Sequence, residues 1–202
     1  MSPSLARLAD ARDNGFIAQA ISPDAAASLL GLPSALPGWL ARLDALPQTI
    51  CHWDAHRANL VSREGESGGV ETIALDWAGV GWGAAGTELS KLLSQTVNFF
   101  GLAPEALPAL DARLFEHYVR GLKDEGWRGD ERDVRFAYTA ASAARLVVRT
   151  ASAVELALNP QARAGFEKAA GLPFAGLAAK FRDVLPYYLS LVDEADRLAG
   201  GA

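Results

Sequence analysis

The sequence predicts a mainly α-helical domain of the α+β class that contains one small β-hairpin. Apolar residues recur at the spacing of an amphipathic helix through most of the 202 residues. Two short runs, "NLVS" and "VETIAL", are rich in strand-forming residues and flank the turn-forming segment "REGESGG", a pattern typical of a hairpin. Half of the residues are hydrophobic, so a single domain over residues 1–202 can bury a core of its own.

Residues 1–48 are predicted to form leading helices. The opening "SPSLARLADARDNGF" has helical spacing, and "SPDAAASLLGLP" begins with the Ser-Pro pair that starts many helices. We expect this second helix to stop at Gly31 and Pro33, because proline inside a helix removes a backbone hydrogen bond. A third helix is expected between Pro37 and Pro47.

The predicted hairpin, residues 59–77, lies in a central segment over residues 49–89. Residues 90–202 are predicted to be a helical subdomain, in which Pro186 should kink or split the last helix. The helices expected after the hairpin cover residues 87–100, 104–122, 131–156 and 174–198.

Charge and composition indicate which classes of partner and which cellular compartment are expected for the protein. The net charge of −5 argues against a nucleic-acid-binding surface. No stretch approaches the roughly 20 apolar residues of a membrane helix, so no membrane partner is expected. The single cysteine, Cys51, rules out an internal disulfide and fits the reducing cytoplasm.

The stretch "CHWDAHRANLV" gathers polar residues just before the predicted hairpin. Asp54 and Asn59 precede the first strand and Asp76 follows the second, so the open end of the hairpin can bring these three side chains together. Two carboxylates and an amide oxygen are hard ligands of the kind that Mg²⁺ prefers. Two other interpretations stay open: His52 and His56 as zinc ligands without an obvious third, or Asp and Asn as ordinary turn residues.

Two motifs carry a resemblance to a known family. The stretch "HWDAHRAN" fits H-G-D-x-H-x-x-N, the catalytic loop of the aminoglycoside phosphotransferase family, whose fold is related to that of protein kinases. The later stretch "LDWAGVGWGAAGTEL" is similar to the metal-binding segment of the same family, I-D-W-x-x-x-G-x-G-D-P-x-x-D-L. With both motifs in order, the chain resembles the helical C-terminal catalytic lobe of these enzymes over nearly its whole length.

The resemblance implies an ATP- and Mg²⁺-dependent phosphotransferase that acts on a hydroxyl group of a small molecule. The sequence does not select the acceptor among the family's substrates. Asp54 would be the catalytic base that accepts the hydroxyl proton, and Asn59 and Asp76 would be the metal ligands. His52 would anchor the loop by hydrogen bonds, and His56 would shape the loop or the acceptor site.

Some positions depart from the family pattern. Trp53 replaces the glycine of the catalytic loop and must find room beside it, and Ala84 stands where a second acid is expected. Thr87 is expected to cap the following helix, with Glu88 as an acid in its first turn.

The chain shows no glycine-rich phosphate loop before His52, and its first lysine is Lys91. The resemblance therefore implies the C-terminal lobe alone, either a fragment or a one-lobed protein. Its apolar lobe face would then invite a missing N-terminal lobe or self-association. The alternative is a non-catalytic descendant that binds a ligand or docks a partner. Arg145 and Arg149 are expected on a solvated or salt-bridged helix face rather than at an anion site.

Overall fold

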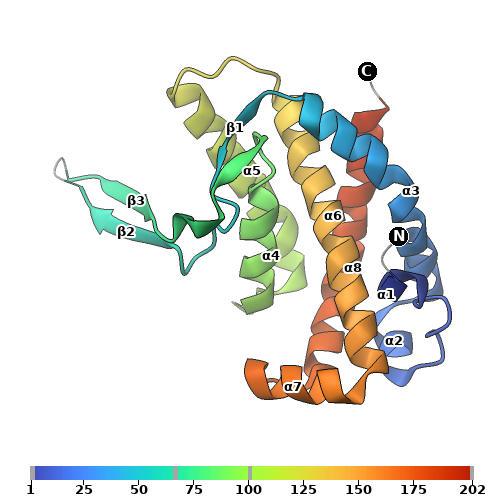
Figure 1. The fold of residues 1–202 in the computed structure, drawn as a ribbon. Coiled ribbons are helices and arrows are strands. Elements are labelled where there is room, and N and C mark those ends of the chain that lie inside the picture. The colour runs from blue at the N-terminus through green and yellow to red at the C-terminus, as the bar shows by residue number, and fades with distance from the viewer. Residues whose placement is uncertain (1–2, 66–67, 100–101, 201–202) are drawn as a thin grey trace.

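Three long helices form the body of the protein in the computed structural model. Helix α6 (Glu131–Leu158) packs against α8 (Phe174–Ala199) on one side and α3 (Pro23–Ala45) on another, and the three lie side by side in Figure 1. The core is built mainly from their buried apolar side chains. The mainly α-helical class is therefore confirmed. The structure describes residues 3–65, 68–99 and 102–200.

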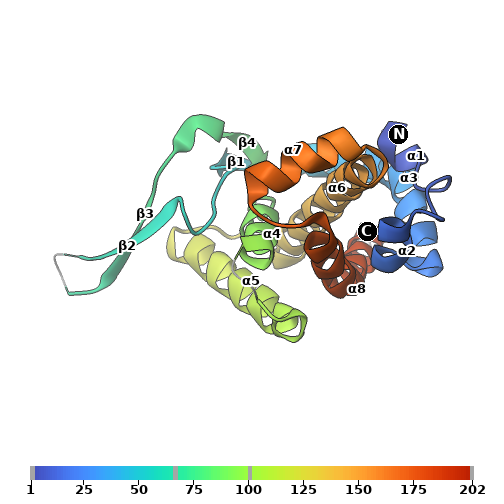
Figure 2. The ribbon, with the colours of Figure 1, turned by 90° about the horizontal axis from the view of Figure 1, so that it is seen from below.

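Shorter elements surround this body. Helices α4 and α5 pack against each other and against α6, while α7 crosses the far end of α6, as the view from below shows (Figure 2). Helix α7 was not among the helices expected from the sequence. The shorter helices are α1 (Pro3–Ala6), α2 (Gly15–Ala20), α4 (Leu89–Phe99), α5 (Leu107–Asp124) and α7 (Pro160–Ala170), with 3-10 turns at Trp77–Gly79 and Pro104–Ala106.

The predicted break in the helix before residue 37 was wrong, because α3 runs without interruption through Pro33 and Pro37. Each interior proline costs a helix about 3 kcal/mol. Burial of a large apolar side chain stabilises the folded state by roughly 1.5–3 kcal/mol, and three such side chains of α3 are almost fully buried. Their packing against the body outweighs the local preference for a break; they are Leu29, Leu32 and Trp39.

The two ends of the chain also differ from expectation. The opening helix is only the single turn α1, and a new helix, α2, begins after Asn14, whose side chain accepts hydrogen bonds from the Phe16 and Ile17 amides. At the other end α8 is not split at Pro186. The carbonyl that loses its partner there belongs to the exposed Arg182, where water can replace the missing N–H.

The predicted hairpin is confirmed and projects away from the helical body (Figure 1). Strand β2 (Leu60–Glu64) pairs antiparallel with β3 (Val70–Ala74). A second two-stranded sheet, of β1 (Gln48–Cys51) and β4 (Gly81–Ala84), was not expected from the sequence. Its strands are four residues long, and "GWGA" contains two glycines, which weaken any strand pattern.

The strand region exposes several large apolar side chains. Ile50 and Trp82 lie opposite each other in the β1–β4 register and are 59% and 71% exposed. Trp77 and Val80, in the connection between the sheets, are also about half exposed.

Among the helices of the described residues, none combines the length and apolar composition that crossing a bilayer requires.

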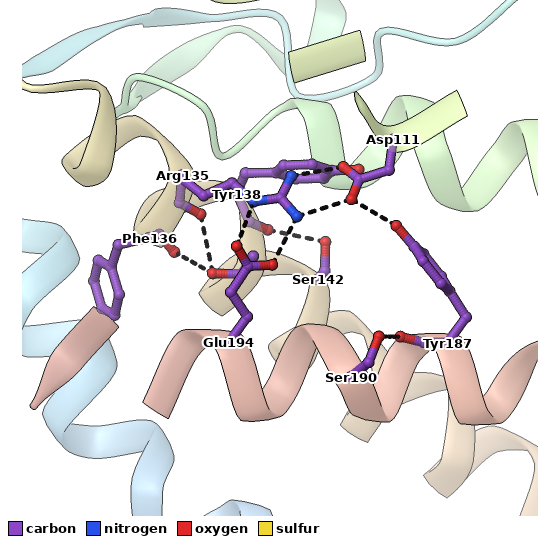
Figure 3. A network of polar contacts seen from close by, with 9 residues as sticks. Asp111, Arg135, Phe136, Tyr138, Ser142, Tyr187, Ser190 and Glu194 are labelled. Carbon is purple, nitrogen blue, oxygen red and sulfur yellow. Dashed lines mark hydrogen bonds and ion pairs between the residues drawn. The ribbon is translucent and has the colours of Figure 1, made fainter. Parts of the chain in front are cut away.

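A buried ionic network joins α5, α6 and α8. Arg135 donates to both carboxylate oxygens of Asp111 at 2.7 and 2.8 Å, and to those of Glu194 at 2.8 and 2.7 Å (Figure 3). The Tyr187 hydroxyl donates to Asp111 at 2.6 Å. Burial alone would raise the pKa of Asp111, but hydrogen bonds from Arg135 and Tyr187 outweigh it and lower that pKa. The network thus fixes three helices with every carboxylate paired.

Candidate active site

His52 connects the two loops that flank the hairpin. It is buried, and its Nε2 lies 2.7 Å from the carbonyl oxygen of Leu75, so this nitrogen carries the proton. Its Nδ1 accepts a hydrogen bond from the Asp54 amide at 3.3 Å. The Glu88 carboxylate accepts a hydrogen bond from the His52 backbone amide at 3.0 Å. His52 therefore holds the residues before Asp76 and at Asp54 in one fixed arrangement.

Two strained residues stand on either side of this histidine link. Trp53 and Asp76 have φ angles of 59° and 58°, and they are the described non-glycine residues with positive φ. Such left-handed backbone costs of order 1–3 kcal/mol per residue and concentrates at functional sites. The bonds of His52 to Asp54 and Leu75 flank both strained positions, so they offset the strain. A glycine would adopt this φ freely, so tryptophan adds backbone strain at a position where the family pattern has glycine.

The indole ring of Trp53 finds its room against two glycines of β4. A Cβ atom on Gly83 would lie 2.5 Å from Trp53 Cζ2, and one on Gly81 would lie 3.1 Å from Trp53 Nε1. Real Cβ atoms do not approach other atoms to 2.5 Å, so Gly83 cannot carry a side chain while the ring stays in place. Strand β4 and the loop of residues 52–59 are thus packed together through Trp53.

The side chain of Asp54 is surrounded by hydrogen-bond donors. The Asn59 side-chain amide donates to the Asp54 carbonyl and to its Oδ2, both at 3.1 Å. His56 Nε2 lies 3.5 Å from the same carboxylate. Lys91 Nζ lies 2.7 Å from Oδ1. The structure thus brings together Asp54, Asn59 and His56 of the sequence-predicted site and adds Lys91, which sequence reasoning did not assign to it.

Lys91 sits in the first turn of α4, where a cation is unfavourable because the helix dipole is positive at that end. Its ion pair with Asp54 compensates for this placement. The hydrogen bond from Lys91 lowers the pKa of Asp54 below its ordinary value, more than partial burial raises it. Asp54 is therefore an anion at neutral pH. The one sequence signal for this lysine was its position three residues after Glu88, in the motif-bearing segment.

Asp76 lies at the open end of the hairpin, one residue beyond Leu75. The Leu75 amide donates to the Asn59 carbonyl at 2.8 Å, so the backbone positions of the two expected metal ligands are adjacent. The exposed carboxylate of Asp76 has no hydrogen-bond or ion-pair partner among the described residues. Asn59 uses its amide N–H groups on Asp54, and these bonds leave its side-chain oxygen available.

The donor chemistry of this site fits a hard divalent cation. Carboxylate and amide oxygens suit Mg²⁺, which keeps further positions for water and phosphate oxygens. Within residues 3–65, 68–99 and 102–200, no group of three His, Cys, Asp or Glu side chains is placed to hold a metal. The zinc interpretation gains nothing from the structure, because His52 and His56 lie in a loop and their Nδ1 atoms already accept backbone amide hydrogen bonds.

Helix α6 approaches the site with Arg145, which donates to the Ser90 hydroxyl at 2.8 Å. Burial lowers the pKa of this arginine, and the charge of Asp54 opposes the shift. Arg149, one turn further, stacks its guanidinium near the rings of Phe181 and Tyr188. Both arginines are half-buried because α6 is covered there by α4 and α8, so a fully solvated helix face is not seen.

Residues 84–88 connect the site to α4. The Thr87 hydroxyl donates to the carbonyl of Ala84 at 2.8 Å, so it closes the preceding turn, and the expected helix cap is not seen. Cys51 lies fully buried beside it, and burial raises the pKa of its thiol. A thiol in that state is a poor nucleophile, so the structure gives Cys51 a packing role.

The two motifs around the hairpin agree with one class of proteins, the phosphotransferases. Residues 3–132 match the model of the Phosphotransferase enzyme family, which is more than half of the chain. The chain belongs to that family, and the resemblance inferred from the two motifs is confirmed. No curated protein and no solved structure matches it.

Proposed function

We propose that this protein transfers the γ-phosphoryl group of ATP, with Mg²⁺, to a hydroxyl group of a small molecule. The observation that carries the proposal is the arrangement of Asp54. Its carboxylate is partly exposed, ionised and oriented by Asn59 and Lys91, in the loop whose motif resembles the catalytic loop of the family. The hairpin, the two strained bends and the His52 link support this arrangement.

In this proposal Asp54 would accept the proton of the attacking hydroxyl as the new oxygen–phosphorus bond forms. The bond between the γ-phosphorus and the bridging oxygen would break in the same transfer, and ADP would leave. Its ionised state suits that role, because a carboxylate can take a proton only when it carries none. Asn59 and Lys91 hold the carboxylate in one orientation, and His52 fixes the backbone on both sides of it. His56, 3.5 Å from the carboxylate, lies where it can contact either the acceptor or the transferred group.

Asn59 and Asp76 would hold the metal through their side-chain oxygens. A bound Mg²⁺ supplies positive charge that neutralises the phosphate oxygens during transfer. Lys91 and Arg145 add fixed positive charge beside Asp54, which further favours an anionic phosphate group over a polycationic ligand. The compartment expected for such an enzyme is the cytoplasm, where ATP and Mg²⁺ are abundant.

The proposal is tested by thermal unfolding of the purified chain with Mg²⁺, with ATP, and with both. A ligand at one hundred times its Kd adds about 2.7 kcal/mol of stability. For a chain of this size that raises Tm by roughly 5–10 °C. We expect this shift only when metal and nucleotide are both present, and we expect Asp76→Asn to remove it.

The matched control is Asp193→Asn, which changes an exposed carboxylate on α8 and should keep the full shift. Transfer from γ-labelled ATP to a pool of small hydroxyl compounds then measures the reaction itself. The non-catalytic alternative predicts no Mg·ATP shift and no labelled product. A shift that survives Asp76→Asn would remove that residue from the metal site.

A further inference from the structure

A cavity of about 460 Å³ lies between helices of the body, and among the described residues none from either β-sheet lines it. Helices α2, α4, α6, α7 and α8 all contribute to its wall, and Figure 2 shows α7 crossing near α6. This volume is in the range of pockets that bind small molecules. None of the residues that contact Asp54 lines it, so the cavity is separate from the candidate active site.

Most of the residues that line this cavity are apolar. Ile17 and Phe174 are buried in the wall. Val148, Phe166 and Leu172 also line it, yet they are 66%, 39% and 46% exposed. Large apolar side chains gathered at the mouth of a cavity mark a binding site for an apolar ligand more often than a solvated surface.

The charged residues in the wall are both cations. Arg149 and Lys180 line the cavity, and no aspartate or glutamate does so among the residues that the structure describes. The Arg149 guanidinium lies 5.8 Å from the ring centre of Phe181 and 5.3 Å from that of Tyr188. These rings hold the guanidinium at the wall, and a cation in an apolar wall attracts an anion strongly.

The cavity lies close to the candidate active site along two helices. On α4, Lys91 contacts Asp54 and Gln95, one turn on, lines the cavity. On α6, Arg145 contacts Ser90 and Arg149, one turn on, lines the cavity. One turn of helix is a rise of about 6 Å, so both helices place the cavity next to the catalytic loop.

We propose that this cavity binds a small anionic amphiphile, with its hydrocarbon body against the apolar wall and its carboxylate or phosphate group at Arg149 and Lys180. The proposal goes beyond the proposed phosphotransfer and does not depend on it. A polycation is excluded by the sign of the wall charges, and a purely polar anion is excluded by the apolar lining.

Calorimetric titration of the full chain with dodecanoate tests this proposal, with dodecyltrimethylammonium as a cation of the same chain length. We expect one dodecanoate per chain and at least tenfold weaker binding of the cation. Arg149→Met should weaken dodecanoate binding at least tenfold, whereas Arg182→Met, on an exposed arginine of α8 outside the cavity, should leave it unchanged.

A second variant keeps the test valid if Arg149→Met does not fold. Ala153→Phe fills the cavity without changing its charge, and it should also weaken binding at least tenfold. Asp54→Asn should bind dodecanoate like the native chain, which separates this site from the catalytic one. Equal binding of both amphiphiles, or no binding, would overturn the proposal. So would a dimer that Phe166→Ser dissociates, because a second copy would then cover the mouth of the cavity.

Discussion

Two clusters of paired acidic and basic side chains in this protein differ in their burial. The loop cluster consists of Asp54 and Lys91, and the body cluster consists of Arg135, Asp111 and Glu194. Beside the loop of residues 52–59, Lys91 pairs with Asp54, whose side chain is 38% exposed. In the helical body, Arg135 pairs with Asp111, whose side chain is 8% exposed, and with Glu194. The first carboxylate can still meet a ligand, and the second is fully occupied by protein donors.

The two clusters also differ in backbone conformation. Trp53 and Asp76 beside the loop cluster have left-handed backbone, whereas all three members of the body cluster lie in regular helix. Strained backbone beside the loop cluster lowers the stability of the fold. The buried polar groups of the body cluster have hydrogen-bond partners and lie in regular helix, which favours the folded state. The comparison teaches that charge pairing alone does not mark a site. The distinguishing features are exposure and local strain.

The largest expected effect is from Arg135→Leu. It leaves the buried carboxylate of Asp111 and the half-buried one of Glu194 without their cation, and breaking a buried ion pair in this way costs about 3–5 kcal/mol. Urea unfolding followed by circular dichroism measures the loss. The control is Arg63→Leu in the hairpin. Arg63 and its ion-pair partner Glu71 are both exposed, so losing this pair should cost no more than about 1 kcal/mol of stability. Equal losses in the two variants would refute the distinction between buried and exposed pairs.

Asp54→Asn is expected to affect the reaction and not the fold. Removing a general base lowers the rate on the order of a thousand-fold. The urea midpoint should change little, because the carboxylate is partly exposed and its ion pair is accessible to water. Initial rates of phosphate transfer and the unfolding curve are measured on the same preparation. Unchanged turnover would remove Asp54 from its role, and a large loss of stability would make the loop cluster structural like the body cluster.

Tyr187→Phe tests how completely the body cluster is paired. It removes one hydrogen bond to the charged Asp111, which costs about 1.5–3 kcal/mol at neutral pH. The pKa of Asp111 is lower in the folded than in the unfolded chain, so the stabilisation is present above the ordinary carboxyl pKa. It is lost as the pH falls through the lower, folded-state value. The difference between native and variant should therefore shrink in acid, and an equal difference at pH 7 and pH 3 would contradict this account.

Gly83→Ala is expected to have the smallest effect, about 1–3 kcal/mol, at the rim of the loop cluster. The added Cβ would overlap the Trp53 ring, so the ring must move. A double-mutant cycle with Trp53→Gly sharpens the test, because the cost of the alanine should fall once the ring is gone. Thermal unfolding of the four proteins gives the coupling. An unchanged cost in the Trp53→Gly background would show that Trp53 does not define the space at Gly83.

Local signals in the sequence were enough for some elements and failed for others. The hairpin was predictable because its strands and its turn are consecutive in the chain. The β1–β4 pairing was not, because Ile50 and Trp82 are far apart in sequence and glycines hide the strand. The continuous course of α3 through Pro33 was also unpredictable from local rules, since burial against α6 and α8 decides it.

The site divides in the same way. The motifs alone named His52, Asp54, His56, Asn59 and Asp76, because spacing within a loop is written directly in the chain. They did not reveal that Lys91 meets Asp54, or that Arg145 turns toward the loop.

By itself, the sequence determined the helical class, the hairpin, the two motifs and the family, all of which depend on residues near one another in the chain. Only the tertiary structure decided which cations face the carboxylate of Asp54, how the indole of Trp53 is accommodated, and where an apolar cavity lined by two cations forms. The physical reason is that these features arise where separate helices and strands meet. Burial and electrostatics there depend on neighbours that no local pattern specifies.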